Sequence, residues 1–145
     1  MTIVVDASVA LKWVLEEPGS DAAEELLEKD LAAPSLWLLE AGNALWRRAF
    51  RGELTQDDAV ERLTALTKAP VASVPLEQDL PEAMRLALQL NHPVYDCLYL
   101  ALAKRLGTYV VTADTRFGQA VANHDTHVGH IRVLSPIVRG RGPRM

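Results

Sequence analysis

Short apolar runs alternate with longer stretches of mixed polarity along most of the chain. Four of these runs have the length and composition of buried strands, and they span residues 2–6, 71–74, 108–112 and 131–134. Residues 31–33 are a weaker strand candidate. Because segments with helical periodicity separate these runs, we predict an α/β fold in which helices cover both faces of a mostly parallel sheet.

Capping residues, glycine and proline mark the expected ends of the helices. Asp21 and Glu24 resemble a capping box at the start of one helix. Ser35 and Thr55 are candidate first residues of two others, and Gly52 marks a helix end. Together with the apolar periodicity, these signals predict helices over residues 8–15, 21–30, 35–51, 55–70, 80–90, 95–106 and 115–122.

Length and composition add the domain organisation. The chain has 145 residues, of which 49% are hydrophobic and 23% charged, and this predicts one globular domain. We expect that domain over residues 1–138, followed by a mobile basic tail over residues 139–145. Cys97 is the single cysteine, so an intrachain disulfide is excluded. No apolar run approaches about 18 residues and no signal peptide is evident, so we expect a cytoplasmic protein.

Four carboxylates occur where strands end, where a helix starts, or within an apolar helix. Asp6 ends the first strand, Asp96 opens the most hydrophobic helix and Asp114 follows the strand over residues 108–112. Each of these aspartates alone is also explained as a helix cap. Because the carboxyl ends of parallel strands collect ligands, and neighbouring acids repel one another unless a cation separates them, the combination predicts a binding site for a divalent metal.

The fourth acid, Glu40, lies in a helix that is apolar on almost every side. Glu40, Asn43 and Arg47 are spaced i, i+3 and i+7, so they form one narrow polar strip. We expect most of this helix to be covered and the strip to face a polar cavity. An ordinary solvated stripe is the alternative interpretation.

Neutral oxygen side chains accompany the acids. Ser8, Asn43 and Thr112 are candidate metal or water contacts beside the carboxylates, and this donor set suits Mg²⁺. The net charge of −4 includes the four candidate acids, and the remaining acidic residues balance the 15 Lys and Arg. A carboxylate cluster that holds one or two Mg²⁺ ions is typical of phosphodiester hydrolysis.

The order and content of these motifs resemble a known family. The resemblance rests on Val5-Asp6-Ala7-Ser8, Glu40-Ala41-Gly42-Asn43, Tyr95-Asp96 and Thr112-Ala113-Asp114-Thr115-Arg116-Phe117. These segments are similar to those of PIN-domain ribonucleases, and most similar to the stand-alone VapC-type toxins of prokaryotic toxin–antitoxin systems. The resemblance covers nearly the whole chain.

This resemblance implies several properties. It implies a five-stranded parallel sheet between helical layers, and RNA cleavage that depends on Mg²⁺ or Mn²⁺. It also implies a homodimer and a cognate VapB-like antitoxin whose basic side chain reaches the acids. By motif, the four metal-site acids are Asp6, Glu40, Asp96 and Asp114, and the supporting polar residues are Ser8, Asn43 and Thr112.

Other chemistry-bearing residues have simpler interpretations. Arg47 and Arg116 are candidate RNA contacts, although solvated charges are the alternative. The spacing of His124, His127 and His130 differs from a helical zinc motif, so we interpret them as loop histidines. Trp46 and Phe50, at i and i+4, form an apolar ridge that suits core or dimer packing better than base stacking.

Rival functions remain at this point. An aspartyl-phosphate phosphatase needs a second acid two residues after the first, where this chain has Ser8. A response-regulator receiver domain needs an adjacent acid pair and a late lysine, and neither is present. A non-catalytic interaction domain of the same fold is a further alternative. So is a PIN-type nuclease of RNA maturation or quality control.

Overall fold

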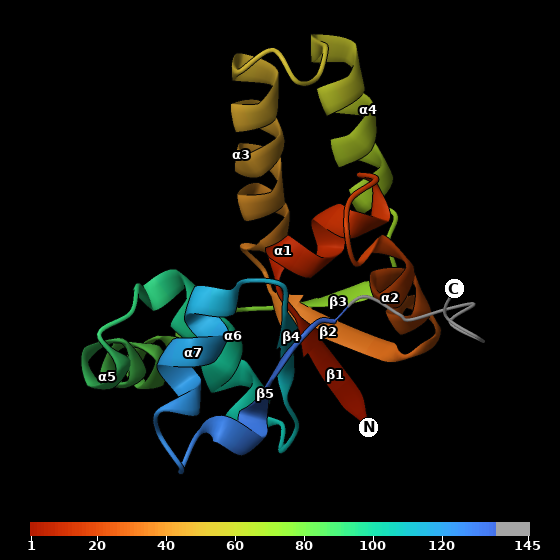
Figure 1. Ribbon diagram of the computed structural model, residues 1–145. Helices are drawn as coiled ribbons and strands as arrows, with labels where there is room; N and C mark the ends of the chain where they lie inside the picture. The colour runs from red at the N-terminus through yellow and green to blue at the C-terminus, as the bar shows by residue number, and fades with distance from the viewer. Residues whose placement is uncertain (136–145) are drawn as a thin grey trace, which may run out of the picture.

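Five parallel strands form the central sheet of this protein, whose computed structural model describes residues 1–135 (Figure 1). The sheet has the order β3-β2-β1-β4-β5, and each neighbouring pair is parallel. The strands are β1 (Thr2–Val5), β2 (Asp30–Pro34), β3 (Val71–Val74), β4 (Val110–Thr112) and β5 (Ile131–Val133). All five expected strands are therefore confirmed, including the weak candidate at residues 31–33.

Seven α-helices occur in the described residues, and they agree in number with the sequence prediction. They are α1 (Ala7–Ala10), α2 (Ser20–Glu25), α3 (Trp37–Phe50), α4 (Gln56–Leu66), α5 (Leu80–Leu90), α6 (Val94–Arg105) and α7 (Thr115–Ala122). The first expected helix, over residues 8–15, is shorter than predicted, because a 3₁₀ turn at Leu11–Trp13 replaces its second half.

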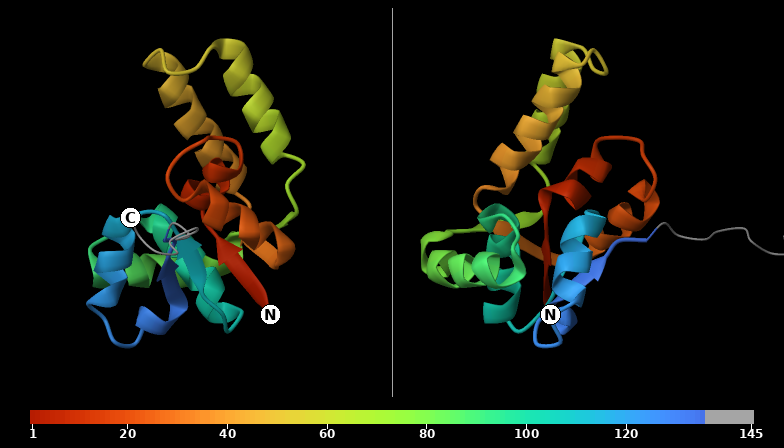
Figure 2. Two further views of the ribbon diagram at one scale, coloured as in Figure 1. Left: turned by 45° about the vertical axis from the view of Figure 1, so that its right-hand side comes forward. Right: turned by 60° about the vertical axis from the view of Figure 1, so that its left-hand side comes forward.

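Alternate residues of β1 belong to different hydrophobic layers. Val4 packs with α3, α5 and α6 in the larger core, whereas Ile3 and Val5 pack with Val9 and Ala23 on the opposite face. Figure 2 shows the α5–α6 pair on one side of the sheet and the α2 segment on the other. The sheet is thus the middle layer of a three-layer α/β/α fold, as predicted.

The helices α3 and α4 form a hairpin that projects from the body of the molecule (Figure 1). Trp37, Ala41 and Leu45 are buried along one side of α3. Gly42 permits the close approach of α4, since a Cβ atom there would lie 3.3 Å from Leu63 Cδ2. The left-handed conformation of Gly52, with φ of 79°, ends α3 as predicted.

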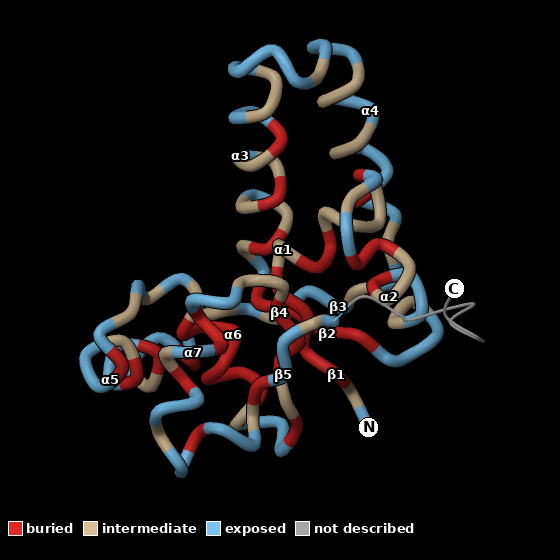
Figure 3. The backbone as a smooth tube through the Cα atoms, viewed as in Figure 1, coloured by how far each residue is buried: buried red, intermediate tan, exposed pale blue. Residues whose placement is uncertain are grey.

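The expectation that most of α3 is covered was wrong. Leu39 and Phe50 are each 78% exposed and Trp46 is 58% exposed, so one apolar stripe of the helix faces solvent (Figure 3). Trp46 and Phe50 stack on each other with ring centroids 5.4 Å apart, outside the core. The reason is the hairpin itself, because α3 has helical neighbours on only part of its circumference.

Two of the predicted helix caps also differ from the structure. Helix α2 begins at Ser20 after Gly19, and the Asp21 carboxylate accepts a hydrogen bond from Ala22 N instead of forming a capping box. Ser35 is not a cap, since Leu36 precedes α3 without a side-chain cap. Thr55, the predicted cap at the start of α4, is confirmed.

The remaining sequence expectations are simple to place. Cys97 is fully buried, and burial raises the pKa of its thiol to about 12. Within residues 1–135, no helix has the length and apolar character needed to cross a membrane. The expected domain end at residue 138 and the basic tail over residues 139–145 lie outside the described residues.

Candidate active site

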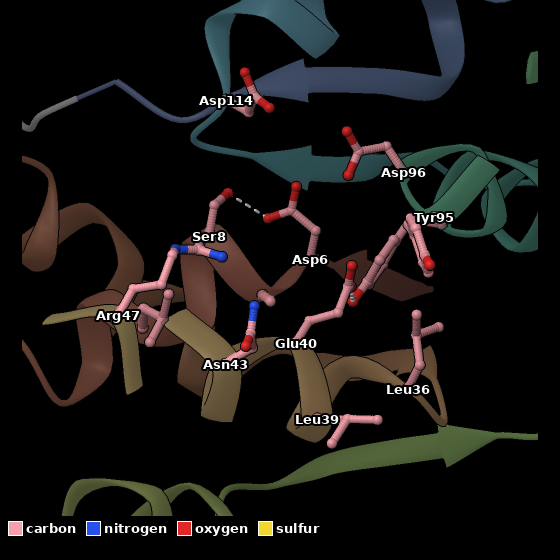
Figure 4. A pocket seen from close by; sticks show the side chains of 13 residues that line it. Asp6, Ser8, Leu36, Leu39, Glu40, Asn43, Arg47, Tyr95, Asp96 and Asp114 are labelled. Carbon is pink, nitrogen blue, oxygen red and sulfur yellow. Dashed lines mark hydrogen bonds between the residues drawn. The ribbon is translucent and has the colours of Figure 1, made fainter. Parts of the chain in front are cut away.

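One cavity at the carboxyl ends of β1 and β4 is lined by all four predicted acids (Figure 4). Its volume is about 560 Å³. Each acid comes from a different part of the chain: the β1–α1 junction, α3, the first turn of α6 and the β4–α7 junction. The fold therefore brings together Asp6, Glu40, Asp96 and Asp114, as the sequence predicted.

Asp6 is the most deeply buried of these acids. It is 5% exposed, and its Oδ1 atom accepts hydrogen bonds from Ser8 Oγ at 2.5 Å and from Val9 N at 3.2 Å. Burial raises the pKa of Asp6 to about 7, because ionisation costs more away from water, while the two hydrogen bonds act in the opposite direction. Asp6 thus caps α1 and presents a carboxylate with unusually high proton affinity.

Ser8 and Thr112 connect the ends of the two central strands. Ser8 Oγ lies 3.5 Å from Thr112 Oγ1 and accepts a hydrogen bond from Ala113 N at 2.9 Å. Thr112 Oγ1 in turn accepts a hydrogen bond from Asp114 N at 3.0 Å. Ser8 lines the cavity, whereas Thr112 is fully buried behind it. Both hydroxyls therefore support the acids, Ser8 from the cavity wall and Thr112 from the buried region behind it.

Glu40 is tied to α6 by a residue that the sequence reasoning missed. Tyr99 is fully buried, and its hydroxyl donates a hydrogen bond of 2.5 Å to Glu40 Oε1. Burial raises the pKa of Glu40, and this hydrogen bond acts against the increase. The available signal was the i, i+3 spacing of Asp96 and Tyr99, which places both on one face of α6.

Asp96 also has a partner that was not predicted. His92 Nε2 lies 2.6 Å from Asp96 Oδ2, and His92 occupies the turn just before α6, four residues earlier in the chain. Burial raises the pKa of Asp96, the bond to His92 lowers it, and the charge of Asp114 raises it. The sequence analysis assigned no role to His92, although its i, i+4 spacing to Asp96 was visible.

Asp114 is the N-cap of α7. Its Oδ1 atom accepts hydrogen bonds from Arg116 N at 2.9 Å and from Phe117 N at 3.4 Å. The capping role and the position on the cavity wall therefore coexist in one side chain. The two interpretations that the sequence left open for Asp114 do not exclude each other.

The candidate RNA contacts differ in their positions. Arg47 and Asn43 lie on the wall that α3 contributes, so the strip with Glu40 does face the cavity (Figure 4). Arg47 is the one cationic side chain among the lining residues in the described part of the chain. Arg116 is exposed and lies outside this lining.

Two histidines of the loop before β5 bind side chains and backbone outside the cavity. His127 is buried, with Nδ1 2.9 Å from Lys104 Nζ and Nε2 2.7 Å from Gln89 Oε1. Because Lys104 is a donor, Nδ1 of His127 accepts and Nε2 carries the proton. His130 Nδ1 donates to Thr108 O at 2.8 Å. These bonds tie the loop to α5, α6 and the start of β4.

The charges of the four acids act on one another. Asp96 raises the pKa of both Asp6 and Glu40, and Asp114 raises that of Asp96. Within residues 1–135, however, no three His, Cys, Asp or Glu side chains are grouped closely enough to hold a metal ion as they stand. The carboxylates surround the cavity and do not converge on one point.

This donor set still fits a hard cation. Mg²⁺ takes oxygen ligands, often through only one or two carboxylates, and keeps several of its waters, so it does not need a closed protein cage. The mutual repulsion of the acids is a cost that a positive charge in the cavity relieves. Asp6 and Asp96, with Glu40 and Asp114, are the side chains that would hold such an ion.

Comparison with known proteins identifies the family. The PIN domain family matches residues 3–122 of this chain. The chain belongs to this family. Ribonuclease VapC3 of Pyrobaculum aerophilum is 37% identical over 129 residues, which cover 82% of this chain and 94% of that protein. Ribonuclease VapC1 of Mycobacterium tuberculosis is 33% identical over 125 residues, covering 81% and 89% of the two chains. This PIN domain is therefore of the VapC type.

Solved structures agree with the fold. The crystal structure of PAE2754 from Pyrobaculum aerophilum aligns with a TM-score of 0.67 and 25% identity, over 92% of this chain and 90% of that one. VapC20 of Mycobacterium tuberculosis, described as a sarcin-ricin loop cleaving toxin, aligns with a TM-score of 0.63 over 81% and 94% of the two chains. At 18% identity, VapC20 supports the fold of the PIN domain alone.

Proposed function

We propose that this PIN domain is a Mg²⁺-dependent endoribonuclease, with Mn²⁺ as a possible substitute, that acts as the toxin of a type II toxin–antitoxin pair in the cytoplasm. The observation that carries the proposal is the meeting of Asp6, Glu40, Asp96 and Asp114 around one cavity. The relatives named ribonuclease VapC support RNA as the substrate.

The residues of the cavity have distinct roles in this proposal. Asp6, Glu40, Asp96 and Asp114 hold the cation, which supplies polarisation of the phosphodiester and activation of a water when it is bound. Ser8 and Tyr99 orient the carboxylates of Asp6 and Glu40 through their hydroxyl donors. Arg47 binds a phosphate of the RNA at the cavity wall. The expected products carry a 5′-phosphate and a 3′-hydroxyl.

Incubation of the purified protein with RNA tests the enzymatic proposal. We expect cleavage with Mg²⁺, no cleavage with a chelator, and loss of cleavage in Asp6→Asn. Asp57→Asn is the matched control, because Asp57 is an exposed acid on α4, outside the cavity lining. Activity that survives both the chelator and Asp6→Asn would contradict the proposal.

The proposed partner is a VapB-like antitoxin. One structural neighbour is VapBC2 of Rickettsia felis, solved bound to a DNA fragment from the promoter of that pair, with a TM-score of 0.63, 12% identity and coverage of 92% and 98%. A basic antitoxin side chain in the cavity would relieve the repulsion of the four acids, as a cation does. Co-expression with the product of the adjacent small reading frame is the test: inhibition of cleavage supports the pairing, and undiminished cleavage contradicts it.

We also propose a homodimer. The exposed apolar side chains of Leu39, Trp46 and Phe50 on α3 give such an assembly surface to bury. Light scattering on the protein as it elutes from a size-exclusion column measures the mass of the assembly directly. A mass of one chain at micromolar concentration would overturn this part of the proposal.

A further inference from the structure

His92 has a firmly held backbone. It follows Asn91, which adopts the left-handed conformation with φ of 52°, in the turn between α5 and α6. Its amide donates to Ala87 O at 3.1 Å, and its carbonyl accepts from Cys97 Sγ at 3.9 Å. The side chain is only 12% exposed. The imidazole therefore projects from a fixed point.

The ring makes two contacts with different helices. Its Nε2 atom lies 2.6 Å from Asp96 Oδ2. Its face stacks on the ring of Phe117, with centroids 5.0 Å apart and an interplanar angle of 17°. An ionised carboxylate only accepts hydrogen bonds, so Nε2 carries the proton in this contact.

Phe117 extends the connection to a second acid of the cavity. Its side chain is fully buried in the first turns of α7, and its amide donates to Asp114 Oδ1 at 3.4 Å. The sequence of contacts thus runs from Asp96 through His92 and Phe117 to Asp114. It spans two acids that come from different helices and repel each other.

We propose that His92 is a positioning residue. It fixes the carboxylate of Asp96 by hydrogen bonding and, through its stack on Phe117, sets the spacing of Asp96 and Asp114 before a cation binds. This inference rests on the proposed function, because it assigns the cation site to the same cavity. His92 is not part of the cavity lining, so it acts on the cation through Asp96 and not by direct contact.

The physical reason is pre-organisation. Asp96 is 29% exposed in its side chain, so without His92 its carboxylate has room for other rotamers and for water. Cation binding would then carry the cost of ordering it. Hydrogen bonds to a ligating group from the layer behind it are worth about 10–100-fold in metal affinity.

Mn²⁺ affinity measured by calorimetry and electron paramagnetic resonance tests the proposal without any RNA substrate. His92→Phe keeps an aromatic ring over Phe117 and removes the donor, so we expect Mn²⁺ binding about 10–100-fold weaker than in the natural chain. His92→Gln retains an amide donor and should recover part of the loss. His124→Phe, a loop histidine outside the cavity lining, is the matched control and should bind Mn²⁺ normally.

Unfolding of the metal-free variants by urea separates positioning from general destabilisation. Mn²⁺ affinity of folded His92→Phe within threefold of the natural chain would overturn the inference. If His92→Phe does not fold, His92→Gln decides: Mn²⁺ binding stronger than in a folded His92→Ala supports the inference, and equal binding overturns it.

The outcome for RNA cleavage is independent. A protein whose Mn²⁺ binding depends on His92 but that cuts no RNA contradicts the proposed nuclease and leaves this inference intact. A natural chain that cuts RNA but shows no measurable Mn²⁺ binding overturns the inference and leaves the nuclease intact.

Discussion

Tyr99 Oη and Glu40 Oε1 are joined by a 2.5 Å hydrogen bond across 59 positions of the sequence. Burial and the neighbouring Glu40 charge raise the pKa of Tyr99 far above its usual range, so the phenol keeps its proton and remains a donor. One buried hydroxyl thus fixes the acid on α3 to the helix that carries Asp96.

Replacement of Tyr99 by phenylalanine removes this donor and little else. We expect Tyr99→Phe to lower the free energy of unfolding by about 1–3 kcal/mol, because a buried hydrogen bond to a carboxylate is lost. The pKa of Glu40 should rise further, since the bond acts to lower it. Urea unfolding and RNA cleavage as a function of pH measure the two effects. Tyr109→Phe is the control, because Tyr109 lies outside the cavity lining and the variant keeps the ring that packs against Arg132.

Asp6 gives the metal-free protein a specific pH dependence. The folded state holds the Asp6 proton up to about pH 7, whereas the unfolded chain releases it near 3.8. The folded state therefore binds more protons inside this window, and the free energy of unfolding falls as pH rises through it. We expect Asp6→Asn to remove this fall and to stabilise the metal-free protein at pH 8 by about 1–3 kcal/mol. Unfolding curves at pH 5 and pH 8 that change equally in both proteins would contradict the expectation.

Added Mg²⁺ should stabilise the natural chain. A ligand that binds only the folded state, at 100 times its dissociation constant, raises the free energy of unfolding by about 2.7 kcal/mol. The Tm should therefore rise with Mg²⁺ and return to its starting value with a chelator. Asp6→Asn should respond much less, whereas Asp57→Asn should respond fully. A Tm increase of the same size in Asp6→Asn would show that the ion binds elsewhere.

The buried His127, which lies away from the cavity, should cause a loss of stability in mild acid. Burial lowers the pKa of His127, and Lys104, His124 and His130 lower it too, while Glu82 on α5 acts in the opposite direction. The unfolded chain therefore takes up the His127 proton near pH 6.5, before the folded state does. The contribution of neutral His127 to the free energy of unfolding is fully present above that pH and is lost as pH falls below it.

Replacement of His127 by glutamine tests this assignment. His127→Gln should flatten the decline in Tm between pH 7 and pH 5. His124→Gln keeps the two bonds to Lys104 and Gln89 and should retain most of the decline. Equal flattening in both variants would assign the pH dependence to the loop as a whole and not to His127.

Local patterns were sufficient to predict the sheet and the four acids. Strands of this fold are short apolar runs, and the acids at their ends stand out because parallel strands share one carboxyl edge. Asp6 and Asp114 are both caps and cavity residues, so either local interpretation led to the right position. The narrow polar strip of a largely apolar helix indicated Glu40, together with Asn43 and Arg47.

Contacts that depend on three-dimensional packing were not predictable in the same way. Nothing in the apolar periodicity of α3 distinguishes a helix in the core from one in a projecting hairpin, so the exposure of Leu39, Trp46 and Phe50 was missed. The roles of His92 and Tyr99 depend on which groups lie opposite them. The spacing of Tyr99 to Asp96 indicated only a shared side of α6, and His92 precedes that helix, so its spacing indicated less.

The projecting hairpin has a mechanical consequence for the chemistry at its base. Glu40 lies near the root of α3, while Trp46 and Phe50 lie toward the tip of the same rigid rod. We expect a partner that binds at the tip and tilts α3 to break the hydrogen bond between Tyr99 and Glu40. The proposed activity is therefore open to control through contacts at the tip of α3, away from the cavity.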